Sequence, residues 1–155
     1  MRHLLAIVAF ICATAFSANA QSIRLDEAIP ALSVTTNLDE TLAMYNRDYT
    51  CLIFAHSESK PCVDAMSNFS TTAERLNSQC AIVIITGEAE ENSAVITERL
   101  SAENYILAFD DNNNTLKAFG INYVPFVVIY RNKNSRVKWF GPIHHLNDDI
   151  IKQLK

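Results

Sequence analysis

A serine and a cysteine three positions apart stand where an apolar strand is expected to lead into a helix. The segment reads Ser-Lys-Pro-Cys from Ser59 to Cys62, and the apolar run 49–55 comes shortly before it. A helix N-terminus presents unpaired backbone N–H groups and a partial positive charge, which lower the pKa of a thiol placed there. Cys62 is therefore the candidate reactive thiol of this chain.

Both ends of this segment have a structural and a functional interpretation. A serine before a helix accepts hydrogen bonds from N–H groups one turn on, worth about 1 kcal/mol, and we favour such a cap for Ser59. Cys62 is either a buried thiol acting as a small apolar group or a single thiol that accepts a mixed disulfide with a partner. His56 could polarise Cys62, although a solvated loop histidine is the interpretation we favour.

The first 20 residues have the pattern of a secretory signal peptide. Basic residues at the start precede the apolar run 4–16, and Ala18-Asn19-Ala20 forms an Ala-x-Ala-type cleavage site. About 13 apolar residues are too few to cross a bilayer, which needs about 20. We therefore expect an exported protein, periplasmic or secreted, with no membrane anchor after cleavage.

Composition limits the partners of the exported chain. Removal of residues 1–20 leaves 12 basic and 17 acidic residues, a net charge of −5, and no stripe of aromatic and basic residues. We therefore expect no nucleic-acid partner. His144-His145 has no second ligand cluster at zinc-like spacing, and the stretch 110–114 lacks the glycine and closing glutamate of a calcium loop. We expect no metal and no cofactor.

Apolar periodicity predicts the elements that hold this segment in place. Continuous apolar runs indicate strands buried on both faces, and apolar spacings of three and four indicate helices. The order of these elements predicts an α/β fold with a central mixed sheet of about four or five strands and helices on both faces. The predicted strands are 49–55, 80–86, 105–110, 125–130 and 136–141; the predicted helices are 37–48, 60–79, 93–100, one turn within 110–120, and 145–155; residues 21–36 form an irregular lead-in to the domain 37–155.

The Ser59 to Cys62 segment and a later Val-Pro pair together resemble the thioredoxin superfamily, in particular its exported TlpA/ResA-like branch. Members of that branch have a strand ending in Phe, then Trp-Cys-x-Pro-Cys opening a helix, and later a Val-Pro pair that contains a cis proline. The matching positions here are Phe54, Glu58, Ser59, Pro61 and Cys62, followed by Val124 and Pro125. The resemblance runs from residue 38 to the C-terminus and implies a thioredoxin-like fold.

Three departures from the family pattern concern its chemistry. Ser59 replaces the first cysteine, and because a hydroxyl neither ionises near neutral pH nor forms a disulfide, dithiol–disulfide cycling within the motif is not possible. Glu58 replaces the aromatic residue and adds a negative charge that opposes thiolate formation. Ile53 stands where thioredoxin has a buried Asp that assists proton transfer. The resemblance therefore implies an incomplete redox site, SxxC.

The resemblance also places two further cysteines at the beginnings of neighbouring parallel strands. There Cys51 and Cys80 could form a structural disulfide, or they could remain as two reduced thiols in the core, because parallel neighbours often have poor disulfide geometry. A redox-active role for this pair is the least favoured, since neither cysteine has the exposed helix end that activates a thiol.

The sequence thus predicts a protein that acts by binding. The resemblance implies a groove where a protein or peptide partner could pair as an extended strand. The alternative is a thiol-disulfide oxidoreductase in which Cys62 forms a mixed disulfide that an external thiol resolves. A peroxidase-like use of Cys62 is poorer, because no Arg or Thr stands near it in sequence. The predicted groove consists of Glu58, Ser59, Lys60, Pro61, Cys62, Val124 and Pro125.

Overall fold

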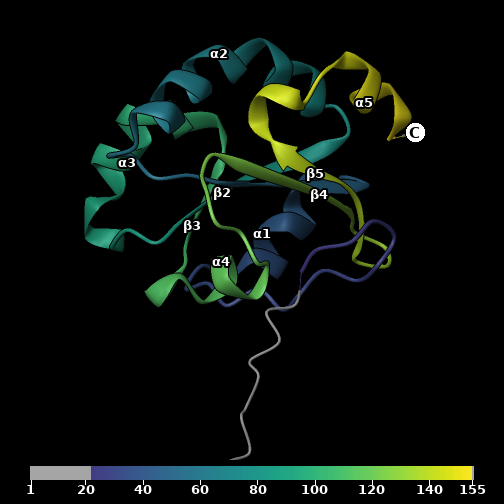
Figure 1. Ribbon diagram of the computed structural model, residues 1–155, viewed down its shortest axis with the longest axis horizontal. Coiled ribbons are helices and arrows are strands. Elements are labelled where there is room, and N and C mark those ends of the chain that lie inside the picture. The colour runs from purple at the N-terminus through teal and green to yellow at the C-terminus, as the bar shows by residue number, and fades with distance from the viewer. Residues whose placement is uncertain (1–21, 155) are drawn as a thin grey trace, which may run out of the picture.

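The computed structural model describes residues 22 to 154, so the expected signal peptide, residues 1–20, lies outside the described residues. One five-stranded sheet in the order β3-β2-β1-β4-β5 forms the centre of the molecule (Figure 1). The strands are β1 (Tyr49–Phe54), β2 (Cys80–Thr86), β3 (Ile106–Phe109), β4 (Phe126–Arg131) and β5 (Arg136–Pro142); the α-helices are α1 (Leu38–Tyr45), α2 (Lys60–Leu76), α3 (Ser93–Arg99), α4 (Asn114–Ala118) and α5 (Asp148–Gln153).

The sheet is mixed, and β1 lies at its centre. It pairs in parallel with β2 and antiparallel with β4, so that Phe54 lies opposite both Ile85 and Phe126. The last residue of β1 is therefore beside the first residue of β4. This register brings the chain that leaves β1 and the chain that enters β4 to the same end of the sheet, and the predicted mixed sheet of four or five strands is confirmed.

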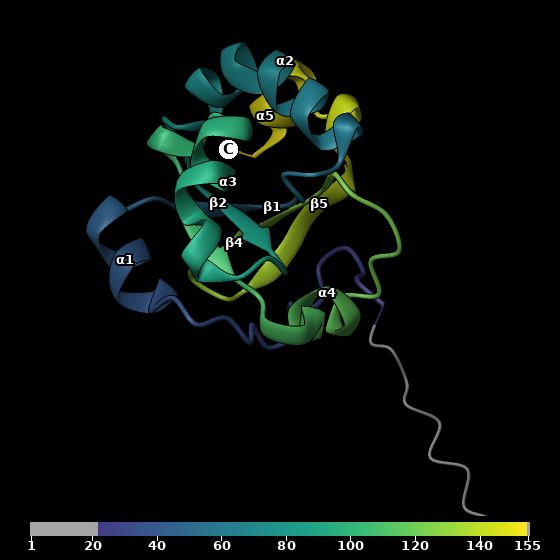
Figure 2. The same cartoon turned by 90° about the vertical axis from the view of Figure 1, so that its left-hand side faces the viewer.

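Helices cover both faces of the sheet, as Figures 1 and 2 show. Side chains of a strand point alternately to its two faces, so Cys51 and Ile53 pack with α2, α3 and α5, while Leu52 and Phe54 pack with α1 and the segment after α4. All six residues of β1 are buried. Burial on both faces explains why this strand reads as a continuous apolar run.

One predicted helix start and one predicted helix cap differ in the structure. The last helix begins at Asp148 rather than at residue 145, because Ile143–His145 forms a separate 3₁₀ turn and Asn147 caps α5 by accepting from the N–H groups of Asp149 and Ile150. The first helix begins after Asn37 as predicted, but the Asn37 side chain makes no capping hydrogen bond.

The lead-in before α1 lies along part of the edge strand β5. The N–H of Asp26 donates to the carbonyl of Val137 at 2.9 Å, and the N–H of Val137 donates to the carbonyl of Glu27 at 2.9 Å. Between residues 22 and 154 no helix has both the length and the apolar character needed to span a membrane.

Candidate functional site

Ser59 is the N-cap residue of α2. Its Oγ accepts a hydrogen bond from the backbone N–H of Cys62 at 3.4 Å, and Pro61 occupies the first turn, where a missing N–H costs nothing. Lys60 points to solvent and pairs with Asp64 one turn on at 2.6 Å. The serine thus occupies the partly exposed position at the helix start, and it satisfies one of the free N–H groups there.

Cys62 is fully buried. Its side chain has 0 % exposure and packs in the core between α2 and the sheet. The Sγ atom accepts from the backbone N–H of His56 at 3.5 Å. An external disulfide could contact this sulfur only if the start of α2 or the loop 55–59 moved.

The negative charge of Glu58 is paired. Arg99, from the end of α3, donates to the Glu58 carboxylate at 2.6 Å and to the backbone carbonyl of Ser57 at 3.2 Å. The sequence predicted that Glu58 would oppose a thiolate at the helix start. The structure shows a compensating cation beside it, so Arg99 weakens that effect, and the pair also ties α3 to the loop before α2.

A second set of contacts holds this loop from the end of β2. The carboxylate of Glu88 accepts from the N–H of Ser57 at 2.8 Å, from the hydroxyl of Ser57, and from the hydroxyl of Thr86 at 2.8 Å. Burial alone would raise the pKa of Glu88, but these hydrogen bonds and the nearby His56 outweigh it and hold that pKa below its ordinary value. Glu88 is therefore an ionised anchor for the loop.

His56 belongs to this loop and meets Cys62 only through its main chain. The ring Nδ1 accepts from the N–H of Glu58 at 3.2 Å and lies 3.8 Å from the Glu88 carboxylate, while the imidazole is about half exposed. The hydrogen bond to the Cys62 sulfur comes from the backbone N–H of His56. This geometry favours the loop-histidine interpretation over a ring that polarises the thiol.

Four residues of the site were not predicted from the sequence: Ser57, Thr86, Glu88 and Arg99. One signal could have located Glu88: it stands two residues after a predicted buried strand, and neighbouring parallel strands end at the same edge of a sheet. A carboxylate there faces the loop that leaves β1. Arg99 had no comparable signal, since its position depends on where α3 packs.

Val124 and Pro125 lie at the same end of the sheet as Ser59. Both are partly exposed, they precede β4, and the peptide bond between them is cis. Next to them the exposed ring of Tyr123 packs edge-on against Phe126, with ring centroids 5.3 Å apart. The structure therefore brings the two halves of the predicted groove to one end of the molecule.

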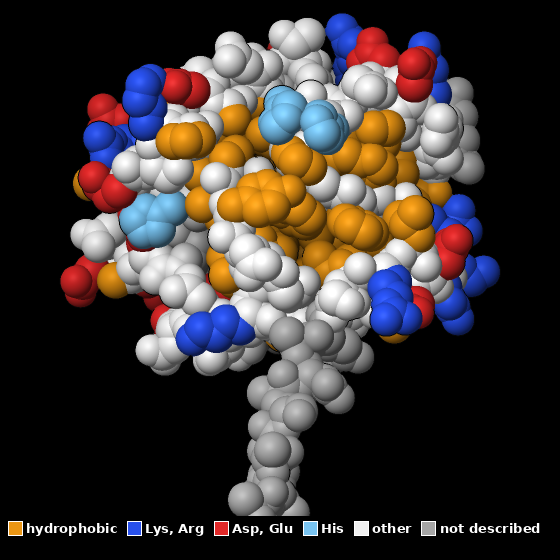
Figure 3. Space-filling view, in the orientation of Figure 1, with side chains coloured by type: hydrophobic (Ala, Val, Ile, Leu, Met, Phe, Trp, Pro, Cys, Tyr) orange, Lys and Arg blue, Asp and Glu red, His pale blue; other side chains and the backbone are white. Residues whose placement is uncertain are grey.

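An apolar surface adjoins this end. The rings of Phe126 and Phe140 lie 6.4 Å apart, and Tyr123 and Phe140 are among the few large apolar side chains that are exposed in the described part of the chain. In Figure 1, β5 and the segment leading into β4 lie toward the viewer, and Figure 3 shows a broad field of apolar side chains on that face. Surface of this kind commonly marks an interaction site.

Cys51 and Cys80 are free, buried thiols, so the suggested disulfide is not formed in the structure. Cys80 pairs with Tyr49, and Cys51 with Ile82, which makes the two cysteines diagonal neighbours on one face. Diagonal neighbours lie roughly 7–8 Å apart, beyond the usual reach of a disulfide. Burial raises the pKa of Cys80 to about 12, although the Arg47 charge opposes this, and burial followed by the Cys80 charge raises that of Cys51.

The described residues hold no cluster of three or more histidines, cysteines or carboxylates that could bind a metal ion. His144 and His145 are exposed, and their rings lie 4.3 Å apart in an edge-on arrangement. The stretch after β3 folds around Asp110, whose buried carboxylate accepts from the N–H groups of Thr115 and Leu116 at 2.8 and 2.9 Å. It is a capped helix start.

Solved structures with the same architecture are thioredoxin-like. The thioredoxin domain of a thiol-disulfide oxidoreductase from Bacteroides vulgatus aligns with a TM-score of 0.62 and 14% identity over 86% of this chain and 96% of that domain. A protein described as thiol:disulfide interchange protein DsbE, from Chlorobium tepidum, aligns with a TM-score of 0.62 and 16% identity over 86% and 94%. Reduced Prx3 from Vibrio vulnificus, solved with hydrogen peroxide, gives 0.61 and 13% over 77% and 86%.

The chain therefore has a thioredoxin-like fold, and the predicted fold class is confirmed. At these identities the likeness concerns the fold alone. No protein-family model matches the sequence, and no curated protein matches it either.

Proposed function

We propose that this protein is an exported, thioredoxin-like binding protein that is similar to the TlpA/ResA-like branch but has an incomplete redox motif, SxxC. Its groove, formed by residues 58–62 and 124–125, takes an extended segment of a protein partner. The observation that carries this proposal is that no exposed thiol lies at the start of α2. The exposed position is a capping serine, and the one thiol, Cys62, is fully buried.

Features around the groove suit a peptide partner. The chain before β4 is partly exposed at Val124 and Pro125, so its backbone groups are available to an added strand. Tyr123 and Phe140 supply exposed aromatic surface close by, and aromatic side chains are enriched where proteins bind one another. We therefore expect a partner segment with apolar side chains.

The loop that forms one side of the groove is well fixed before any partner arrives. Glu88 and Arg99 hold Ser57 and Glu58 from two different elements. A surface that is already ordered loses less conformational entropy on binding. The order of this loop therefore lowers the entropy cost of recognition at the site.

A single-thiol oxidoreductase is the second candidate, and one contact favours it. The N–H of His56 points at the Cys62 sulfur, and a hydrogen bond of this kind stabilises a thiolate. In such a reaction the Cys62 thiolate attacks a partner's disulfide, forms a mixed disulfide and releases one partner thiolate. One external thiol such as glutathione then attacks the partner's sulfur in the mixed disulfide, which releases the Cys62 thiolate and leaves a partner–glutathione disulfide. A second glutathione attacks this bond, releases the partner's second thiolate and leaves oxidised glutathione.

A redox assay on the mature chain, beginning at Gln21, separates the two candidates. We expect wild type not to reduce a model disulfide in the presence of glutathione, and Ser59→Cys to gain activity because it restores two cysteines. Reduction by wild type that Cys62→Ala abolishes would show that the binding-only proposal is wrong.

Selection from a library of displayed linear peptides tests binding directly. Selected peptides should be enriched in apolar residues, and Tyr123→Ala should weaken their binding by about tenfold or more. Tyr45→Ala is the matched control, because Tyr45 is 45% exposed against 54% for Tyr123 and lies on α1. Equal losses from the two substitutions would contradict a groove beside Pro125.

Export is tested by cell fractionation with and without residues 1–20.

A further inference from the structure

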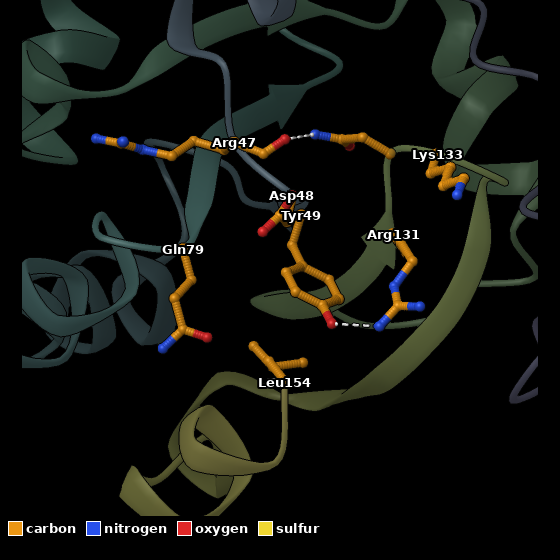
Figure 4. Close-up of a pocket in the computed structure, with 8 residues that line it drawn as sticks. Arg47, Asp48, Tyr49, Gln79, Arg131, Lys133 and Leu154 are labelled. Carbon is orange, nitrogen blue, oxygen red and sulfur yellow. Dashed lines mark hydrogen bonds between the residues drawn. The ribbon is translucent and has the colours of Figure 1, made fainter.

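A cavity of about 600 Å³ lies at the end of the sheet opposite Ser59. Tyr49, the first residue of β1, and Arg131, the last residue of β4, both line it, whereas Ser59 follows the other end of β1. Figure 4 shows the lining side chains. This cavity is therefore separate from the groove described above, and its size is within the range of small-molecule sites.

The cavity is positively charged. Its lining includes the cations of Arg47, Arg131 and Lys133 and a single acid, Asp48. Within residues 22 to 154 none of these three cations has a carboxylate oxygen within 4.0 Å, although the chain as a whole has a net charge of −4. Cations without a carboxylate partner attract anions, and in Figure 4 Arg131 and Lys133 lie on the same side of the cavity, whereas the Arg47 side chain points away from them.

Arg131 is held in place with most of its donors free. Its Nη2 donates to the hydroxyl of Tyr49 at 2.9 Å, and its guanidinium carbon lies 5.5 Å from the centre of that ring (Figure 4). Tyr49 is itself buried, so it is a firm support. A guanidinium has five N–H donors in a planar fork, and Tyr49 is the one side-chain partner in the described part of the chain. The remaining donors suit a carboxylate or a phosphate.

The rest of the cavity supplies rigid, mixed surface. Asn132 accepts from Thr50 and donates to the carbonyl of Arg47, both at 2.7 Å, and so braces the cavity wall. In Figure 4 the Tyr49 ring lies between Arg131 and Gln79, with Leu154 facing it. An amide group and apolar surface therefore lie next to the cationic side of the cavity. An inorganic ion would make no use of this apolar surface.

We propose that this cavity binds a small organic anion. Its carboxylate or phosphate pairs with the guanidinium of Arg131, and the charge of Lys133 adds to the attraction. Its apolar part lies against Tyr49 and Leu154. No redox or covalent step is involved.

Phenyl phosphate is the probe, titrated into the mature protein by calorimetry at constant ionic strength. We expect saturable one-to-one binding, tighter than that of inorganic phosphate. Arg131→Gln should weaken it about tenfold or more, since it removes a charge-assisted contact. Lys133→Gln, at an exposed position where folding is not at risk, should weaken it about threefold. The matched control is Lys117→Gln on α4, at the other end of the sheet, which should leave it unchanged.

Three results would overturn this proposal. The first is no saturation up to about 10 mM phenyl phosphate, because such an affinity would be weaker than even a modest small-ligand affinity. The second is equal affinity for phenyl phosphate and inorganic phosphate, which would show that the apolar wall is unused. The third is an equal loss of affinity in Lys117→Gln and Lys133→Gln, which would show attraction to overall charge. We expect the bound probe to change the NMR chemical shifts of Tyr49 and Leu154 and to leave that of Ser59 unchanged, which would locate the probe in this cavity.

Discussion

Ser57 and Glu88 are joined twice, across 31 positions of sequence. The backbone N–H and the hydroxyl of Ser57 both donate to the Glu88 carboxylate, which links the loop before α2 to the chain after β2. Ser57 is 2% exposed and the Glu88 side chain 11%, so water competes weakly for these bonds. The position of the loop 55–59 therefore depends on a residue that lies outside the segment from Ser59 to Cys62.

Substitution of this carboxylate should destabilise the protein. Glu88→Gln places an amide where one N–H donor and two O–H donors converge, and the loss should be about 1 to 3 kcal/mol in the free energy of unfolding at neutral pH. Urea denaturation measures it. Glu90→Gln removes the same charge from an exposed position on the next turn and should have little effect; equal losses from the two would show that net charge is responsible.

The effect of Glu88 should also depend on pH in one direction. The pKa of Glu88 is lower in the folded protein than the ordinary value of about 4.3, so its ionised form stabilises the fold fully above that value. As the pH falls from about 4.3 through the folded pKa, this contribution is lost. The difference in unfolding free energy between wild type and Glu88→Gln should shrink as the pH falls below about 4.3. A difference that grows in acid would contradict the lowered pKa.

Ser59→Ala tests the capping role. The N–O distance of 3.4 Å is long for a hydrogen bond, so we expect a loss of about 0.5 to 1 kcal/mol, the lower part of the range for N-caps. Thermal unfolding followed by circular dichroism measures it. Ser67→Ala on the exposed side of α2 is the control and should change stability less. A neutral Ser59→Ala would mean that water replaces the cap.

Native thiol labelling should be slow at all three cysteines in the described part of the chain. Cys51, Cys62 and Cys80 are buried, and a pKa of about 12 leaves roughly one Cys80 thiol in ten thousand ionised at pH 8. Iodoacetamide followed by mass spectrometry should label them only in denaturant. Ser67→Cys, at an exposed position on α2, should label within minutes and shows that the reagent is active. Rapid native labelling of Cys62 would instead favour the single-thiol alternative.

The strands could be predicted from the sequence because a strand buried on both faces appears as a continuous run of apolar residues. β2 is found at its predicted residues, 80–86, and β1 ends one residue earlier than predicted. Helix α2 was equally clear, since Met66, Phe69 and Ala73 repeat on its buried face. Local signals of this kind do not depend on contacts far away in sequence.

No local sequence pattern indicated where the last helix starts or which residues contact the loop 55–59. The residues around His145 are compatible with a helix that begins there. In the structure Asn147 caps the helix by accepting from the N–H of Ile150, and so the helix begins at Asp148. The contacts of Glu88 and Arg99 depend on which strands and helices become neighbours. Only the fold decides that, so polar residues of ordinary appearance became part of the site.

The pairing of the lead-in with β5 affects how this protein behaves among copies of itself. An uncovered edge strand offers a row of free N–H and carbonyl groups on which another chain can build a sheet. Here Asp26 and Glu27 occupy those groups around Val137. A chain shortened past Ile29 would expose that edge, and we expect it to self-associate.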